Sequence, residues 1–426
     1  MKLFPHFAVI AGALVLLVAV ALVILNFTQG DRRIERALPK LYGTHDPQFR
    51  RVMGNLLGPA ILGGNRVQEL LNGDQIFPQM LAAISGAQRS ITFETYIYWS
   101  GDIGKAFADA LSERARAGVK THVLLDWVGS AKMDESLLEG MKAAGVEVVK
   151  FHQPSWYTLD KMNNRTHRKL LVTDGKVGFT GGVGIAPSWT GAAQDKDHWR
   201  DTHFKVEGPA VAQMQATFLD NWIKAKGAVL HGEAYFPELA PAGPMSAQMF
   251  SSSPTSGADN MELMYHVAIT AAGRSIDLSM AYFVPDDFSN RALLAALQRG
   301  VKIRIIVPGP ITDSETVRAA GRRMWGDLLR AGAEIHEYQP TMFHCKAMVV
   351  DGLLVSVGST NFDGRSFRLN DEANLNVYDE AFAARQTAIF EDDLKRARRV
   401  TLQEWENRPL WERVKEWPGA VLGSQM

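Results

Sequence analysis

Cysteine is nearly absent from the sequence, since Cys345 is the only one in 426 residues. An intramolecular disulfide is therefore impossible, and the redox compartment stays open. The formal net charge is zero, so the composition gives no reason to expect nucleic acid as a partner. No cluster of cysteine and histidine with metal-ligand spacing stands out. We therefore expect no metal ion and no other cofactor.

Apolar residues, in contrast, are plentiful: 46% of the chain is hydrophobic and only 22% is charged. These proportions are typical of a globular protein with a sizeable core rather than of a disordered chain. The length of 426 residues suggests two or three domains, or one large pseudo-symmetric unit.

One long apolar run lies at the N-terminus, FAVIAGALVLLVAVALVIL from Phe7 to Leu25. A helix of this length spans about the ~30 Å hydrocarbon layer of a bilayer. A cleaved signal peptide would have a shorter run and a small-residue cleavage site, which the following ILNFTQGDRR lacks. We therefore predict a retained membrane anchor over residues 1–30, followed by a polar juxtamembrane connector over 31–60.

The basic residues around this run indicate an orientation. Lys2 precedes it, and four basic residues follow it: Arg32, Arg33, Arg36 and Lys40. The positive-inside rule therefore favours a cytoplasmic body, although an extracytoplasmic body stays open.

The rest of the chain repeats itself loosely. Residues 90–130 parallel residues 275–314: each has an alternating apolar segment, an amphipathic helix that ends at a glycine, and a β-branched strand. Strands that alternate with helices predict an α/β fold. We interpret the repeat as two homologous halves, a first half over residues 61–240 and a second half over 241–410, with a tail at 411–426.

The most informative pattern is a short motif that occurs once in each half. THRKLLVTDGKVGFTGG covers residues 166–182, and FHCKAMVVDGLLVSVGSTN covers 343–361. The Asp-Gly pair in each copy predicts a tight hairpin turn. A single copy would fit a strand with exposed polar residues, but two copies in corresponding places make chance an unlikely explanation.

Strand geometry brings the polar residues of each motif together. Residues i and i+2 face the same side of a strand, so His167 shares a face with Lys169. His344 and Lys346 share a face in the same way. If the halves meet face to face, the pocket between them holds two imidazoles and two ammonium groups. It also holds the hydroxyl of Ser359 and the amide of Asn361. Such a pocket suits an anionic tetrahedral centre such as phosphate.

Two histidines in one pocket can divide the work of phosphoryl transfer. A neutral histidine can attack phosphorus, and a protonated one can give its proton to the departing alkoxide. Each imidazole also needs an acceptor for its other ring nitrogen. Asp201 in the first half and Glu372 in the second are the candidates, although spacing alone equally allows surface carboxylates or strand-end ion pairs.

These motifs resemble the signature of the phospholipase D superfamily, HxK(x4)D(x6)GSxxN. The second copy matches it with the shorter ending GSxN, and the chain is most similar to bacterial cardiolipin synthases over roughly residues 60–410. The resemblance implies an α/β fold in which two homologous phospholipase D-type halves, related by pseudo-twofold symmetry, share one active site, with the N-terminal transmembrane helix in addition.

The resemblance also implies roles for the residues. His167 forms a phosphohistidine, and His344 acts as general acid and then base. Glu372 orients the histidine of its own half, and Asp201 is its counterpart in the first half. The groups expected to bind phosphate are Lys169, Lys346, Ser359 and Asn361. The motif aspartates, Asp174 and Asp351, complete the predicted catalytic set, with a part that is more structural than chemical.

The first motif departs from the family pattern in one place. The sequence GGVGIAPSW has Gly184 where many relatives carry an asparagine. One amide that would bind phosphate is therefore missing from the first motif.

The expected activity is a phosphatidyl transfer at the bacterial cell membrane. Phosphatidylglycerol would be both donor and acceptor, cardiolipin the product and glycerol the leaving group, with membrane phospholipids as partners and no nucleic acid. Two alternatives stay open: a phospholipase D-type hydrolase that uses water as acceptor, and an inactive membrane scaffold of the same fold.

Overall fold

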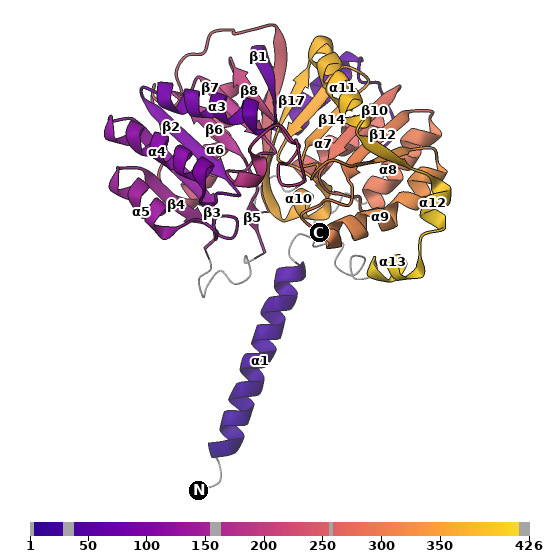
Figure 1. Ribbon diagram of the computed structural model, residues 1–426, viewed down its shortest axis with the longest axis horizontal. Coiled ribbons are helices and arrows are strands. Elements are labelled where there is room, and N and C mark those ends of the chain that lie inside the picture. Colours follow the sequence, from indigo (N-terminus) through magenta and orange to yellow (C-terminus); the bar gives the residue numbers. More distant parts are fainter. Residues whose placement is uncertain (1–3, 29–37, 154–162, 255–258, 417–426) are drawn as a thin grey trace.

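The computed structural model describes residues 4–28, 38–153, 163–254 and 259–416. Parts of the predicted segments lie outside these residues: 1–3 and 29–30 of the anchor, 31–37 of the connector and 417–426 of the tail. Figure 1 shows a large α/β body and one long helix that projects from it.

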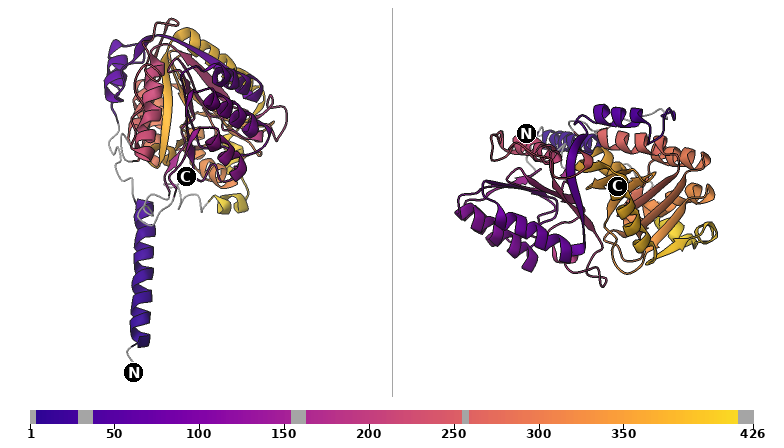
Figure 2. Two further views of the ribbon diagram at one scale, coloured as in Figure 1. Left: turned by 90° about the vertical axis from the view of Figure 1, so that its left-hand side faces the viewer. Right: turned by 90° about the horizontal axis from the view of Figure 1, so that it is seen from above.

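The projecting helix is α1 (Phe4–Thr28), which forms over the apolar run. Both views in which it is seen from the side show it pointing away from the body (Figures 1 and 2). Its described side chains, from Ile10 to Leu22, are almost all exposed. Within the part of the chain that the structure describes, no helix is long and apolar enough to cross a membrane.

The body is built on one long sheet that contains strands from both halves. The first half contributes the following strands: β1 (Leu62–Leu71), β2 (Ser90–Thr95), β3 (Lys120–Asp126), β4 (Glu147–Phe151), β6 (Leu170–Thr173), β7 (Val177–Gly181) and β8 (Thr202–Glu207). The second half contributes β9 (Met245–Ser252), β10 (Ser275–Met280), β12 (Lys302–Pro308), β13 (Glu334–Tyr338), β14 (Lys346–Val350), β15 (Leu354–Gly358), β17 (Asn370–Tyr378) and β18 (Ala397–Val400).

The strand order repeats from one half to the other. It is β1-β8-β7-β6-β2-β3-β4 in the first half and β9-β17-β15-β14-β10-β12-β13 in the second, and β1 pairs with β9 where the two sets meet. Parallel pairs, such as β2 with β3 and β10 with β12, are linked by helices. The mixed α/β class predicted from the sequence is therefore confirmed.

Helices cover the sheet in both halves (Figures 1 and 2). Those of the first half are α3 (Asn72–Gly86), α4 (Asp102–Arg116), α5 (Glu135–Ala143) and α6 (Ala210–Lys226). Those of the second half are α7 (Asn260–Ala271), α8 (Asp287–Gln298), α9 (Glu315–Arg330) and α11 (Glu380–Leu394). Short elements complete the body: α2 (Pro47–Leu56), β5 (Arg165–Thr166), η2 (Pro187–Trp189), β11 (Phe283–Val284), β16 (Phe362–Asp363), α10 (Gly364–Arg368), α12 (Leu402–Glu406) and α13 (Leu410–Lys415).

Local sequence signals explain the ends of these elements. Helices α4 and α8 are each followed by a glycine with positive φ, 90° at Gly118 and 86° at Gly300, as expected just past a helix C-terminus. The two predicted Asp-Gly turns are also present, because Asp174 and Asp351 have φ of 55° and 54° and the following glycines are positive too. Two successive positive φ angles define the type I′ hairpin turn.

The apolar core continues from one half into the other. Phe218 and Trp222 of α6 belong to the same buried cluster as Val355 of β15 and Leu375 of β17. Because this cluster draws on both halves, their relative position is fixed by close packing. A site that lies between them can therefore be held rigidly.

Candidate active site

The two histidine motifs begin next to strands of the opposite half. Before His167, the short strand β5 pairs in parallel with β17 of the second half, and the His167 N–H donates to the Asp371 carbonyl at 2.9 Å. In the corresponding place, the His344 N–H donates to the Arg200 carbonyl of the first half at 2.8 Å. Each histidine is thus placed by the half to which it does not belong.

This exchange decides which carboxylate faces which histidine. Nδ1 of His167 lies 2.9 Å from Oε1 of Glu372, and Nδ1 of His344 lies 2.8 Å from Oδ2 of Asp201. The prediction that each acid orients the histidine of its own half is wrong. The pairs cross over because Glu372 follows the Asp371 carbonyl that holds His167, and Asp201 follows the Arg200 carbonyl that holds His344.

Burial and charge set the protonation of these pairs. Burial alone would raise the pKa of both carboxyls, but the facing histidines hold the pKa of Asp201 and of Glu372 below its usual value. Both acids are therefore ionised and can only accept hydrogen bonds, so each Nδ1 carries a proton. Burial lowers the pKa of His167 to about 4, and burial together with Lys346 lowers the pKa of His344. In its neutral form each imidazole has a lone pair on Nε2, which can attack phosphorus or take up a proton.

The two lysines lie beside their histidines, as predicted. Nζ of Lys169 donates to the His167 carbonyl at 2.7 Å. Nζ of Lys346 donates to the His344 carbonyl at 2.8 Å and lies 3.2 Å from its Nδ1. Burial lowers the pKa of Lys169 to about 7 and lowers that of Lys346 as well. A buried cation thus lies beside each histidine, which makes the site attractive to an anion.

A cavity of about 360 Å³ opens onto these groups. Its walls include both motif histidines, Lys169 and Asn361, as predicted, whereas Lys346 is buried behind His344 and is not among the lining residues. Aromatic side chains form much of the remainder: Tyr96, Trp99, Trp189, Trp199 and Tyr282. The ring centroid of Tyr96 lies 5.3 Å from that of His167, and the Trp189 centroid lies 5.2 Å from that of His344. Each histidine therefore faces the cavity with an aromatic ring beside it.

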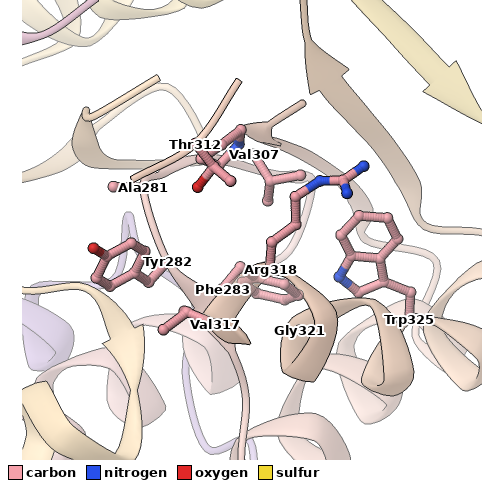
Figure 3. Close-up of a pocket in the computed structure, with 10 residues that line it drawn as sticks. Ala281, Tyr282, Phe283, Val307, Thr312, Val317, Arg318, Gly321 and Trp325 are labelled. Carbon is pink, nitrogen blue, oxygen red and sulfur yellow. The ribbon is translucent and has the colours of Figure 1, made fainter. Parts of the chain in front are cut away.

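A second, much smaller pocket of about 20 Å³ lies beside this cavity and shares Tyr282 and Val317 with it. Figure 3 shows these two side chains on one side of the small pocket, with Arg318 and Trp325 on the other. A volume of this size holds about one water molecule. The small pocket cannot take a substrate group, so the larger cavity is the candidate active site.

Ser359 does not line the cavity, and its predicted contact with phosphate is a second correction. The Ser359 hydroxyl donates to Oε2 of Glu372 at 2.5 Å and accepts from the Ala373 N–H at 3.0 Å. The side chain is fully buried, and its hydroxyl points to the neighbouring strand β17 rather than into the cavity. Ser359 therefore holds the carboxylate that orients His167.

The motif aspartates lie away from the cavity as well, which corrects their inclusion in the catalytic set. Asp174 accepts the N–H groups of Arg89 and Ser90 at 2.7 and 3.0 Å. Asp351 accepts those of Arg274 and Ser275 at 2.7 and 2.9 Å. The hairpin turn at the far end of each motif strand separates these residues from the histidines. Their part is to fix the starts of β2 and β10.

The cavity residues that were not predicted include two arginines, Arg165 and Arg365. A signal for the first was present, because Arg165 precedes His167 by two residues and so continues the alternation that joins His167 to Lys169. Arg365 lies on the short helix α10, which no sequence pattern had indicated. In the part of the chain that the structure describes, no group of three or more potential ligands could hold a metal ion.

Comparisons with known proteins agree with this geometry. The sequence model of the family described as "Cardiolipin synthase, PLD-like domain" matches residues 80–222 and 265–394. The major cardiolipin synthase of Bacillus subtilis (strain 168) is 34% identical over 361 residues, which are 84% of this chain and 75% of the relative. A cardiolipin synthase of Oceanobacillus iheyensis is 35% identical over 353 residues, 83% of this chain and 73% of the relative.

Among solved structures, a phosphatidylserine synthase from Haemophilus influenzae superposes with a TM-score of 0.68. The superposition covers 89% of this chain and 98% of that one, at 14% sequence identity. At this identity, the similarity shows a shared fold.

Proposed function

The chain belongs to the phospholipase D-like cardiolipin synthase family, and we propose that it makes cardiolipin from two molecules of phosphatidylglycerol. One molecule donates a phosphatidyl group and releases glycerol, and the other accepts the group on a hydroxyl of its headgroup. The observation that carries the proposal is the pair of carboxylate-oriented histidines that face one cavity. Two homologous halves in a pseudo-twofold arrangement, with one shared site, account for this pairing.

The first step forms a covalent intermediate. Nε2 of His167 attacks phosphorus, the bond from phosphorus to the headgroup oxygen breaks, and His344 in its protonated form gives a proton to the departing glycerol. Glu372 holds Nδ1–H of His167 and stabilises the positive charge that the ring gains. Lys169, Lys346 and Asn361 stabilise the charge on the phosphate oxygens.

The second step is the reverse of the first, with the acceptor lipid in the place of glycerol. His344, now neutral, takes a proton from a hydroxyl of the acceptor lipid, whose oxygen attacks phosphorus while the bond to Nε2 of His167 breaks. Transfer requires that a lipid alcohol reach the phosphohistidine more readily than water does. The aromatic walls of the cavity, with Trp189 and Trp199 near His344, support transfer over hydrolysis.

We also propose that α1 anchors the enzyme to the bacterial cell membrane, with the body on the cytoplasmic side. What supports this is a helix of 25 residues with exposed apolar side chains such as Leu14, Leu17 and Val18. Such a helix would confine the site to the surface on which its substrates lie. A protease added to sealed spheroplasts should leave the body intact, whereas its digestion would place the body on the other side.

The function is tested with the purified full-length protein in phosphatidylglycerol vesicles. Cardiolipin and glycerol should appear in equal amounts, and His167→Ala and His344→Ala should each abolish both. Phosphatidic acid in place of cardiolipin would identify a hydrolase. The absence of any product would favour the inactive scaffold.

A further inference from the structure

A cationic patch in the cavity extends beyond the catalytic pair of the first half. Arg165, His167 and Lys169 alternate along one segment, and all three line the cavity. Lys169 and His167 are only 3% and 9% exposed, whereas Arg165 is half-buried. The row therefore leads from the buried phosphate-binding groups outward to a more accessible guanidinium.

A second arginine joins the first from the opposite half. Arg365 of α10 lines the same cavity and is half-buried too. Its Nη1 and Nη2 each donate to Oδ1 of Asn163 at 3.1 Å, and Nη2 also donates to the Asn163 carbonyl at 2.9 Å. Asn163 lies two residues before Arg165, so the segment that carries one arginine also orients the other.

The acidic groups of the cavity also make hydrogen bonds within the protein, and Nη1 of Arg165 itself donates to the Asn164 carbonyl at 2.6 Å. The Asp363 carboxylate accepts the Ser366 N–H at 2.7 Å as the N-cap of α10, and Asp313 accepts the Tyr282 hydroxyl at 2.6 Å. Burial lowers the pKa of Arg365, and the charge of Arg165 lowers it further. An anion between two guanidinium groups would offset this repulsion.

The two arginines break the symmetry of the site. The motif histidines are 177 residues apart, and at the same offset Arg165 corresponds to Met342 and Arg365 to Ser188. The catalytic pairs thus occur twice, while the guanidinium pair occurs once. The phosphate that is attacked between the histidines contacts the groups that occur twice. The guanidinium pair, which occurs once, therefore suits a negative charge that only one of the reacting molecules brings.

We propose that Arg165 and Arg365 form an anion subsite for the phosphodiester of the acceptor lipid. This inference rests on the proposed function, in which the acceptor phosphate lies one glycerol away from the phosphate between the histidines. A guanidinium matches two phosphate oxygens in bidentate geometry. The subsite would hold the acceptor headgroup with its hydroxyl at the phosphohistidine and would favour an anionic lipid over water.

The test compares two acceptors for one donor. The full-length protein in phosphatidylglycerol vesicles can pass the phosphatidyl group either to the lipid itself or to ethanol, a neutral alcohol without phosphate. Initial rates of cardiolipin and of phosphatidylethanol are measured for the wild type and for Arg165→Gln, Arg365→Gln and the double variant. A charge-matched control is Arg89→Gln with Arg116→Gln, two exposed side chains outside the cavity.

The double variant should lose cardiolipin formation by about 10²-fold, since it removes two charge-assisted contacts. It should keep phosphatidylethanol formation within about threefold, and the control should keep both activities. Arg165→Lys with Arg365→Lys should recover part of the cardiolipin rate, because charge returns without the bidentate geometry. Thermal unfolding shows that each variant is folded.

Two results would overturn the inference while the proposed function stands. An equal loss with both acceptors would place the arginines in donor binding or catalysis, and unchanged rates would remove them from substrate binding. If the wild type forms phosphatidylethanol but no cardiolipin, the proposed function fails, and the subsite for a lipid acceptor fails with it.

Discussion

The two sides of the active site reach one geometry with different residues. On one side, Ser359 donates to Glu372, which orients His167. On the other side, the indole Nε1 of Trp189 donates to Oδ2 of Asp201 at 2.9 Å. Each carboxylate thus accepts from one histidine and from at least one further side chain, and Glu372 also accepts from Nδ2 of Asn370 at 3.2 Å. The repeat preserves an arrangement of donors and acceptors rather than particular residues.

Steric space explains why the donors differ. Gly182 occupies the position of Ser359, and a Cβ on Gly182 would lie 2.2 Å from Oδ1 of Asp201. A serine therefore does not fit there, and Trp189 supplies the hydrogen bond instead. Gly184 has the same explanation, because a Cβ there would lie 2.7 Å from Cβ of Ile97 and 3.1 Å from the Trp189 ring. The missing asparagine of the first motif is therefore explained by the close approach of Ile97, with the Trp189 ring beside it.

The largest effects are expected at the histidines, and they separate the two sides by role. His167→Ala and His344→Ala should each lower turnover by about 10³-fold or more. Only His344→Ala should still accumulate a phosphatidyl-enzyme, because His167 remains as nucleophile. Mass spectrometry after an alkaline quench detects the adduct. An adduct in His167→Ala, and none in the other variant, would reverse the two roles.

The next largest effects test the crossed pairs. Glu372→Gln and Asp201→Asn each remove the negative charge that orients one imidazole, and each should lower kcat by about 10–100-fold. Glu372→Gln should slow formation of the phosphatidyl-enzyme, in common with loss of His167. Asp201→Asn should slow formation of the phosphatidyl-enzyme and also its breakdown, because His344 gives a proton in the first step and takes one in the second. Rapid-quench kinetics resolves the two steps, and the opposite assignment would contradict the crossed pairing.

The pH dependence tests the buried lysine. Burial lowers the pKa of Lys169 to about 7, so the cation that binds phosphate is lost as the pH rises through that value. His167, with a pKa of about 4, stays neutral over the same range. We expect kcat/KM to fall above a pH of about 7 in the wild type. In Lys169→Arg this fall should become smaller, because arginine stays charged while His344 and Lys346 still lose their protons, and an unchanged alkaline limb would exclude Lys169 as a source.

A smaller effect compares the two donors directly. Ser359→Ala removes the hydroxyl that Glu372 accepts, and Trp189→Phe removes the N–H that Asp201 accepts while it keeps an aromatic ring. Each change leaves a buried carboxylate with one contact fewer and should lower kcat by about tenfold. Steady-state rates at fixed lipid concentration suffice. A loss in one variant alone would mean that the two sides are not equivalent.

The smallest effects on activity are expected at the turns. Asp174→Asn and Asp351→Asn weaken the hydrogen bonds that start β2 and β10 and should lower the free energy of unfolding by about 1–3 kcal/mol. At temperatures where the variants are folded, turnover should stay within about threefold of the wild type. Denaturant unfolding and activity, measured on the same samples, check this. A large loss of turnover in a fully folded variant would return these aspartates to the catalytic set.

Local patterns predicted much of this structure from the sequence. Alternation placed His167 with Lys169, the Asp-Gly pairs marked type I′ turns, and Gly118 and Gly300 marked helix ends. These features depend on residues within a few positions of one another. The 177-residue repeat extended the prediction to the α/β class and to two motifs that meet.

The crossed pairs could not be predicted because they depend on contacts between segments far apart in the chain. Glu372 faces His167 only because β5 lies beside β17, and a two-residue strand has no sequence signature of its own. Ser359 was misassigned for a related reason. Its position in the motif was correct, but the direction of its hydroxyl depends on the neighbouring strand.

The crossed pairing is tested most directly by ¹⁵N NMR of the histidine side chains in the full-length protein. Glu372→Gln should shift the Nδ1 resonance of His167 and leave that of His344 in place. Asp201→Asn should do the reverse, with the two signals assigned from the His→Ala variants. If Glu372→Gln shifted His344 instead, each carboxylate would serve its own half and the shared site described above would be wrong.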